Sequence, residues 1–151
     1  MQETTAQTAA VQRLRAANLR VTVPRVAVLE TLQAHPHISA KVTAELVRER
    51  IGKVSTQAVY DVLAACTEAG LLRCIEPAGS VARYETRRGD NHHHLVCRRC
   101  DRVTDADCVI GNPPCLTPDD DAGYLVDTAE VVFWGLCPQC LEQRTEKERH
   151  G

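Results

Sequence analysis

Ser55-Thr-Gln-Ala-Val-Tyr-Asp-Val-Leu-Ala-Ala-Cys-Thr-Glu-Ala-Gly70 is the stretch that decides the fold of the first half of the chain. Serine is a favoured residue at a helix N-terminus, and glycine commonly ends a helix. Apolar residues recur at the i, i+3, i+4, i+7 spacing of a buried helical face: Val59, Val62, Leu63 and Cys66. The first turns on the opposite side carry Thr56, Gln57, Tyr60 and Asp61. The pattern predicts an amphipathic helix whose exposed face carries short polar and aromatic groups.

Three further helices are expected before this one. Asn18 ends the first helix, Pro24 opens the second, and Ser39 caps a third that Gly52 stops. Residues 35–39, with the sequence HPHIS, are expected to interrupt the helical structure between the second and third helices. The expected apolar faces consist of Ala9, Ala10, Leu14 and Ala17 in the first, Val28, Leu29 and Leu32 in the second, and Val42, Leu46, Val47 and Ile51 in the third.

A short Gly-Lys-Val link joins the third helix to the fourth, as in a helix-turn-helix, whose second helix enters the DNA major groove. Leu71–Ile75 and Val81–Glu85 flank a turn with Pro and Gly, which predicts a β-hairpin and hence a winged helix. Thr56, Gln57 and Tyr60 would face bases, and Arg20, Arg25, Arg73 and Arg83 would contact phosphates. A small helical bundle with a solvated polar face is the alternative.

Composition narrows the possible functions. The 151 residues, 44% apolar and 25% charged, allow one domain or two small ones. The sequence contains no apolar run long enough to span a membrane and no N-terminal signal pattern, so we expect a cytoplasmic protein. Five aromatic residues are too few for a protein that stacks unpaired bases. The chain up to Arg83 has net charge +3 and the remainder −5, which fits contact with a polyanion through the first half only.

Two CxxC pairs dominate the second half: Cys97 with Cys100, and Cys137 with Cys140. Four thiolates at this spacing can form a tetrahedral zinc site. The 36 residues between the pairs exceed the loop of a simple zinc ribbon, so the ion would join two distant segments and stabilise the fold. The alternative is a thioredoxin-like redox pair. No βαβ pattern surrounds either pair, so structural zinc is favoured.

Asp90-Asn-His92-His93-His94-Leu-Val precedes the first CxxC pair. In a strand, His92 and His94 would lie on one face and His93 on the other. With Glu85, Asp105 and one histidine of His35 and His37, these residues would offer three imidazoles and two carboxylates. Such nitrogen and oxygen ligands suit Fe²⁺, Mn²⁺ or Zn²⁺. A His-rich surface tract without function is the alternative.

The chain resembles the ferric uptake regulator (Fur) family of bacterial metal-dependent repressors from about Ala9 to Lys147. The matching stretches are Leu19-Arg-Val-Thr-Val-Pro-Arg25, His37-Ile-Ser39, Gln57-Ala-Val-Tyr-Asp-Val-Leu63, Arg83-Tyr-Glu85, His92-His-His-Leu-Val-Cys97 and both CxxC pairs. The resemblance implies an α+β protein with a winged-helix DNA-binding domain (1–84), a hinge (85–91) and a dimerisation and metal-binding domain (92–151). It also implies structural Zn²⁺ at Cys97, Cys100, Cys137 and Cys140, and a regulatory Fe²⁺, Mn²⁺ or Zn²⁺ at His37, Glu85, His92, His94 and Asp105.

Within the family, the stretch from Asp107 to Cys137 is similar to an actinobacterial branch associated with catalase-peroxidase genes. Asp105 agrees with peroxide-sensing members, since iron-sensing members usually carry Glu there. The resemblance therefore implies a homodimeric repressor of operator DNA, without membrane or small-molecule partners, that peroxide releases by oxidising a histidine ligand or a thiol of Cys74, Cys108 or Cys115. An iron or zinc uptake regulator and a CxxC thiol oxidoreductase are the alternatives. No catalytic constellation is found, so we expect no enzyme.

Overall fold

The computed structural model describes residues 2–86, 92–108 and 114–149. The chain divides into an N-terminal unit, Met1–Arg88, and a C-terminal unit, Gly89–Gly151. Helices and a small sheet form the first unit, and a second sheet with one helix forms the other, so the fold is α+β. Of the expected hinge, residues 87–91 lie outside the described part. None of the described helices combines the length and apolar character that crossing a membrane requires.

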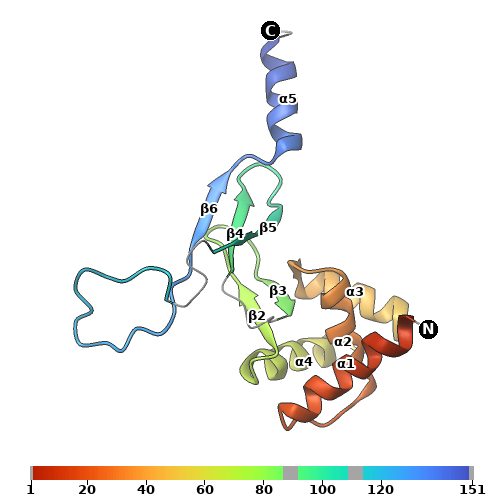
Figure 1. Ribbon diagram of the computed structural model, residues 1–151. Coiled ribbons are helices and arrows are strands. Elements are labelled where there is room, and N and C mark those ends of the chain that lie inside the picture. The colour runs from red at the N-terminus through yellow and green to blue at the C-terminus, as the bar shows by residue number, and fades with distance from the viewer. Residues whose placement is uncertain (1, 87–91, 109–113, 150–151) are drawn as a thin grey trace. The chain divides into compact units, whose positions relative to one another are not determined.

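Four helices make up most of the N-terminal unit (Figure 1): α1 (Gln2–Ala16), α2 (Val23–Ala34), α3 (Ala40–Ile51) and α4 (Thr56–Glu68). Helix α2 contacts the other three and occupies the centre of the unit. The most deeply buried core side chains are Leu14, Val28, Leu29, Leu32, Val47, Val59, Leu63 and Cys66. The predicted buried face of the fourth helix is therefore confirmed.

Side-chain caps begin three of the helices, and two of these caps, at Ser39 and Ser55, were predicted. The hydroxyl of Thr22 accepts a hydrogen bond from the backbone N–H of Arg25, that of Ser39 from Val42, and that of Ser55 from Ala58. Such caps satisfy N–H groups that have no partner within the helix. Helix α3 ends at Gly52, whose φ of +80° is accessible to glycine at little cost and turns the chain toward α4.

The predicted apolar face of α3 is wrong at one position. Val42 is 38% exposed, whereas Thr43, Ala44 and Val47 are buried. The buried face of α3 is thus rotated toward the small residues Thr43 and Ala44. The hydroxyl of buried Thr43 donates to the carbonyl of Ser39 at 2.8 Å, so its burial leaves no hydroxyl unsatisfied.

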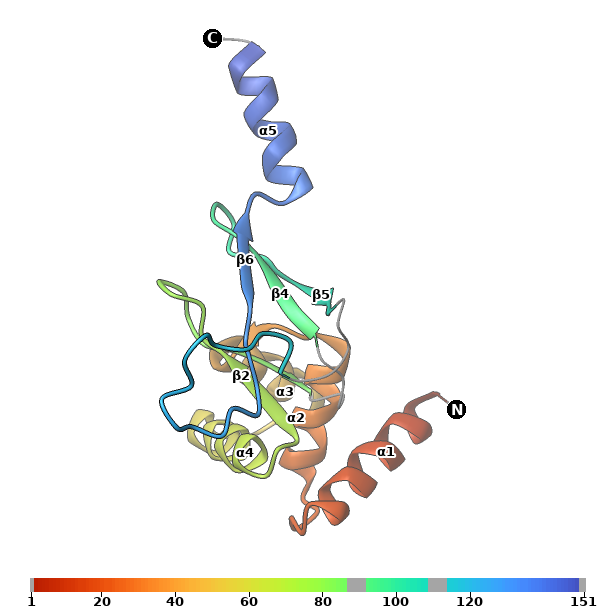
Figure 2. The ribbon, with the colours of Figure 1, turned by 60° about the vertical axis from the view of Figure 1, so that its left-hand side comes forward.

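A three-stranded sheet with order β1-β3-β2 completes the N-terminal unit. Strands β2 (Leu72–Ile75) and β3 (Arg83–Thr86) pair antiparallel, which confirms the predicted hairpin; we call this hairpin the wing (Figure 2). Strand β1 (Ile38–Ser39) pairs with β3 in the stretch predicted only as a break. Two residues are too short to show a strand periodicity, so this pairing was not predicted.

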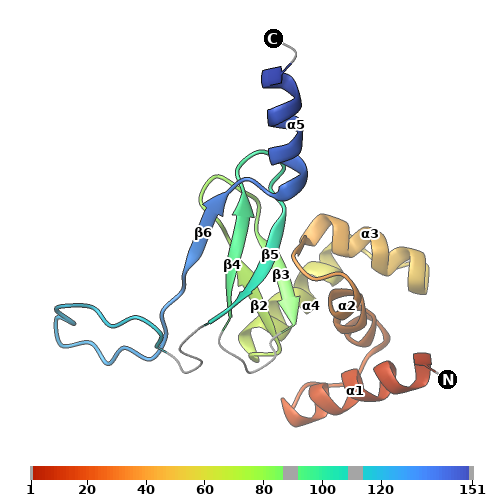
Figure 3. The same cartoon turned by 45° about the horizontal axis from the view of Figure 1, so that its top comes forward.

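The C-terminal unit contains a second sheet, with order β5-β4-β6 (Figure 3). Strand β4 (His92–Cys97) pairs antiparallel with β5 (Val103–Asp107) and parallel with β6 (Val132–Gly135), and α5 (Pro138–Arg149) follows. The strand predicted for the histidine tract is confirmed. Between β5 and β6, residues 114–131 contain no helix or strand.

Candidate functional site

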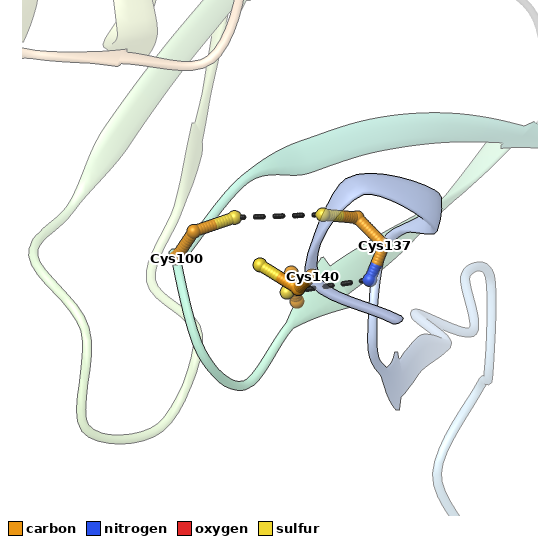
Figure 4. Close-up of side chains that lie close together, drawn as sticks. Cys100, Cys137 and Cys140 are labelled. Atoms are coloured by element: carbon orange, nitrogen blue, oxygen red, sulfur yellow. Dashed lines mark hydrogen bonds between the residues drawn. The ribbon is translucent and has the colours of Figure 1, made fainter. Parts of the chain in front are cut away.

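The four cysteines of the CxxC pairs meet at one end of the second sheet. Cys97 ends β4 and Cys100 lies in the turn to β5, whereas Cys137 and Cys140 lie at the start of α5. Their four Sγ atoms all lie within 4.8 Å of one another. The Sγ atoms of Cys100 and Cys137 are 3.7 Å apart (Figure 4), close to the spacing of about 3.8 Å that Zn–S bonds of about 2.3 Å give in a tetrahedron.

Two of these thiols have strongly perturbed proton affinities. The backbone N–H of Cys137 donates to Sγ of Cys97 and lowers the pKa of Cys97 to about 6. Burial raises the pKa of the Cys140 thiol to about 12, and the neighbouring thiols add to the effect. Four thiolates this close require a cation. A tetrahedral sulfur donor set fits Zn²⁺, so the cluster is consistent with structural zinc.

The predicted ligands of the N-terminal unit form a buried pair. Nε2 of His37 lies 2.8 Å from Oε2 of Glu85, and both side chains are buried. The backbone of His37 is bonded on both sides to β3: its N–H donates to the carbonyl of Tyr84 at 2.9 Å, and its carbonyl accepts from Arg83 at 3.1 Å. His35 is exposed. Of the two histidines left open by the sequence, His37 therefore partners Glu85.

The predicted ligands of the C-terminal unit also gather. His94 pairs in register with Asp105 across β4 and β5. Nε2 of His92 and Nε2 of His94 each lie 3.5 Å from the same carboxylate oxygen, Oδ1 of Asp105. Both histidines are buried, and Asp105 is partly exposed. Two imidazole nitrogens and a carboxylate thus converge, as the alternation predicted.

His93 points to the other face of β4 and contacts a cysteine. Its Nε2 lies 3.0 Å from Sγ of Cys115, and both side chains are buried. Cys108, directly after β5, offers its sulfur to the same group. The sequence placed His93 on this face but could not identify Cys115 as its neighbour, because Cys115 lies in a segment without regular structure.

The first turns of α4 expose the predicted base-reading residues. Thr56, Gln57, Tyr60 and Asp61 are all exposed. Thr56 accepts a hydrogen bond from the Arg48 guanidinium, and the amide of Gln57 donates to Asp61 at 2.8 Å. These contacts orient Thr56 and Gln57 on the exposed surface of the first turns of α4.

The predicted phosphate-contacting arginines differ in their surroundings. Arg20 is exposed, and its carbonyl accepts a hydrogen bond from the partly buried Arg25 at 2.7 Å. Arg83 is partly buried and donates to His37, as described above. Because a guanidinium carries five N–H donors, Arg25 and Arg83 keep further donors for other contacts.

A winged helix-turn-helix joined to a sheet unit with cysteine and His/carboxylate clusters defines a metal-responsive DNA-binding regulator. Residues 16–110 match the model of the Ferric uptake regulator family, and the chain belongs to this family. It is 59% identical over 136 residues to the transcriptional regulator FurA of Mycobacterium tuberculosis, covering 90% of this chain and 92% of FurA. It is 54% identical to ferric uptake regulation protein 1 of Mycolicibacterium fortuitum, over 80% of this chain and 75% of that protein.

Solved structures agree with this assignment. The Vibrio cholerae ferric uptake regulator is 27% identical with a TM-score of 0.64, covering 83% of this chain and 98% of that one. The peroxide stress regulator of Campylobacter jejuni, 20% identical over 88% and 97% of the two chains with a TM-score of 0.63, shows the same fold. Fur-family proteins bind DNA as dimers, and this chain is a transcriptional regulator rather than an enzyme.

Proposed function

We propose that this Fur-family regulator is a metal-dependent repressor that binds operator DNA as a homodimer in the cytoplasm and leaves it under peroxide or redox stress. Control of catalase-peroxidase or other oxidative-stress genes is the expected role. The observation that carries the proposal is the division of the nitrogen and oxygen donors between the two units. His37 and Glu85 belong to the N-terminal unit, and His92, His94 and Asp105 belong to the C-terminal unit.

In this proposal one Fe²⁺, Mn²⁺ or Zn²⁺ takes ligands from both groups. Three imidazoles and two carboxylates suit these ions, which accept five or six mixed ligands. His37 and Glu85 are well placed for such a role because His37 directly precedes β1 and donates its N–H to Tyr84 of β3, while Glu85 lies in β3, so ligand binding would fix the wing as well as the side chains. A regulatory ion would therefore hold the DNA-reading unit in one orientation to the C-terminal unit.

The orientation matters because the regulator would act as a two-fold dimer. Half-sites on DNA lie about one helical turn apart or a multiple of it, so the two α4 helices must be spaced to match. Metal and operator would then select the same conformer. Each must increase the affinity of the other by the same factor.

The exposed residues of α4 and the arginines supply the DNA contacts. Thr56, Gln57 and Tyr60 would read base edges, and Arg20, Arg25 and Arg83 would contact phosphates. The exposure of Tyr60 supports its base-reading role, since this side chain is 40% exposed and lies on the first turns of α4. Neither a membrane nor a small-molecule substrate takes part in this function.

Release by peroxide follows from the ligand set. Bound Fe²⁺ would supply the electrons that reduce H₂O₂ and lead to oxidation of a neighbouring side chain. Oxidation of His92 or His94 would remove a nitrogen donor, whereas oxidation of Cys74, Cys108 or Cys115 would act through a thiol. Asp105 favours the histidine route, because the resemblance associates Asp at this position with peroxide sensing.

The test begins with selection of an operator from a random duplex library by the Mn²⁺-loaded protein. Operator affinity is then measured with Fe²⁺, Mn²⁺ and Zn²⁺, each before and after H₂O₂, with mass spectrometry of the peptide that holds His92 and His94. We expect peroxide to abolish binding of the Fe²⁺ form and to leave the Mn²⁺ form unchanged. Equal affinity before and after peroxide in all forms would contradict the proposal.

An iron or zinc uptake regulator is the second candidate. It is favoured by the description of two Mycolicibacterium fortuitum relatives as ferric uptake regulation proteins. The same titration separates the two functions. An uptake regulator would respond to the concentration of one metal, and its operator complex would survive peroxide.

A further inference from the structure

Asp61 is an exposed residue of α4 to which the proposed function gives no role. We propose that Asp61 determines part of the operator sequence: its carboxylate accepts a hydrogen bond from the exocyclic amino group of one operator base, either N4 of cytosine or N6 of adenine. The inference rests on the proposed function in one respect, namely that the first turns of α4 enter the DNA major groove. It does not depend on the identity of the regulatory metal or on the response to peroxide.

Asp61 lies on the same face of α4 as two of the residues proposed to read bases. Gln57, Tyr60 and Asp61 occupy positions i, i+3 and i+4 of the helix, and all three are exposed. One turn further along this face, Ala64 is also exposed and carries only a methyl group, so no long side chain there would hold the helix away from the groove. A major groove that receives Tyr60 would therefore also receive Asp61.

A hydrogen bond between Gln57 and Asp61 fixes the orientation of both polar groups. Nε2 of Gln57 donates to Oδ1 of Asp61 at 2.8 Å. Because a carboxylate only accepts hydrogen bonds, the amide must turn its NH₂ group toward Asp61 and its carbonyl oxygen away. A carboxylate has about four lone-pair sites, so Asp61 can accept from a further donor while the bond to Gln57 persists.

The charge of Asp61 restricts the groups on DNA that it can contact. Asp61 takes part in none of the ion pairs found among the described residues. A carboxylate without a cation repels the phosphate groups that dominate the affinity of proteins for DNA. In the major groove, cytosine N4 and adenine N6 carry donors, whereas guanine O6 and N7 and thymine O4 only accept. Asp61 would therefore favour cytosine or adenine at one position of the contacted strand and disfavour guanine or thymine.

The alternative is that Gln57 and Asp61 form an ordinary solvated pair that only supports the helix. Glutamine and aspartate at positions i and i+4 stabilise isolated helices slightly. Helix α4 has other support, since Ser55 caps its N-terminus and its apolar face packs in the core. A purely structural pair would leave the base preference of the protein unchanged, so the two interpretations predict different results.

The test compares the base preferences of wild type, D61N and E68Q, each selected against the same random duplex library as the full-length, Mn²⁺-loaded protein. Asparagine keeps the shape of aspartate but removes the charge and adds a donor. Glu68 is exposed at the other end of α4, so E68Q removes the same charge from the same helix without altering its first turns. Fluorescence anisotropy at one fixed salt concentration then measures affinity for operators with each of the four bases at each position.

We expect wild type to prefer cytosine or adenine at one base pair of each half-site. Replacing that base by guanine or thymine should weaken binding by wild type roughly 5–150-fold, the usual cost of a mismatched base pair. D61N should lose this preference at that base pair alone, and E68Q should keep it. The base that wild type selects identifies the amino group that Asp61 contacts.

Three results would overturn the proposal. The first is a D61N variant with the base preference of wild type, which would leave the proposed function intact, whereas an operator complex that survives peroxide would do the reverse. The second is a change in D61N that disappears in the Q57A background, because Asp61 would then act only by orienting Gln57. The third is a wild type that enriches no sequence, which would overturn the proposed function as well.

Discussion

Nε2 of His37 lies 2.8 Å from Oε2 of Glu85. His37 directly precedes β1, and Glu85 lies in β3, the strand with which β1 pairs. Both side chains are buried, so a charge on either needs a partner. The backbone of His37 is held by two hydrogen bonds to residues of β3, one to the carbonyl of Tyr84 and one from the guanidinium of Arg83, which leaves the pair little freedom to adapt. It is therefore a preformed half of a metal site in the proposed function.

Replacement of His37 tests this role. We expect H37A to lower the metal-dependent affinity for operator by at least about tenfold, since even outer residues of metal sites commonly cost 10–100-fold when changed. The matched control is H35A, because His35 is exposed and lies two residues away. Fluorescence anisotropy with a labelled operator, titrated with Mn²⁺, measures both. Equal operator affinities for H37A and H35A would show that His37 is not a ligand of the regulatory metal.

Loss of the four-cysteine cluster should destabilise the C-terminal unit. Structural zinc contributes on the order of 10 kcal/mol to small domains. A domain of this size shifts its Tm by about 4–8 °C per kcal/mol. We expect C137S to lose a zinc ion and to unfold at least about 10 °C lower than wild type, and C74S to match wild type. Differential scanning calorimetry combined with zinc analysis checks both expectations.

Tyr60 should contribute to sequence recognition rather than to general DNA affinity. A side chain that contacts a base edge is worth about 1–3 kcal/mol, so we expect Y60A to bind the selected operator roughly 10–100-fold more weakly. Binding to a scrambled duplex should change little, since phosphate contacts dominate it. The control is Y124A, another exposed tyrosine outside α4. Parallel losses on both duplexes would mean that Tyr60 does not read bases.

Cysteine reactivity should follow burial. Burial raises the pKa of the Cys66 thiol, although Arg25 and Arg13 oppose the effect. A raised thiol pKa lowers the thiolate fraction, and the thiolate is the reactive form. At pH 8 we therefore expect iodoacetamide to modify the exposed Cys74 more than about tenfold faster than Cys66, with similar rates in urea. Mass spectrometry of timed digests gives the two rates.

The ion pair Arg50–Glu30 of the N-terminal unit should contribute more to the free energy of unfolding than the exposed pair Arg144–Glu148. Nη2 of Arg50 lies 2.6 Å from Oε2 of Glu30, whose side chain is 7% exposed. Arg50 is itself partly exposed, so its removal would mainly leave the buried carboxylate of Glu30 without its partner. We therefore expect R50A to lower the free energy of unfolding by about 1–3 kcal/mol, the penalty for a buried acceptor that is left unpaired. Loss of the exposed pair Arg144–Glu148 in R144A should lower the free energy of unfolding by less than about 0.5 kcal/mol. Urea denaturation compares the two variants.

Much of this structure could be predicted from local sequence patterns. The caps at Ser39 and Ser55, the hairpin, and the alternation of the histidines depend on residues close in sequence, and each prediction was confirmed. The CxxC spacing pointed to a cluster of the four cysteines, and their sulfur atoms do lie together, because the tetrahedral requirement of a zinc ion does not depend on the chain between the two pairs.

Features that depend on distant partners were missed. Strand β1 exists only because β3 lies beside it, and β6 only because β4 accepts it as a parallel neighbour. The buried face of α3 is set by the helices that pack against it, so the exposed position of Val42 could not be read from the periodicity. Cys115 approaches His93 from a segment whose sequence specifies no regular structure.

Cys97 is the last residue of β4, the strand that carries all three histidines. A slip of this strand by a single residue against β5 would turn His93 toward Asp105 and turn its two neighbours away. The slip would also move the sulfur of Cys97 away from the other three cysteine sulfurs. Zinc bound by the four sulfurs would therefore fix the register of β4 against β5, and with it the face of the strand on which each imidazole lies.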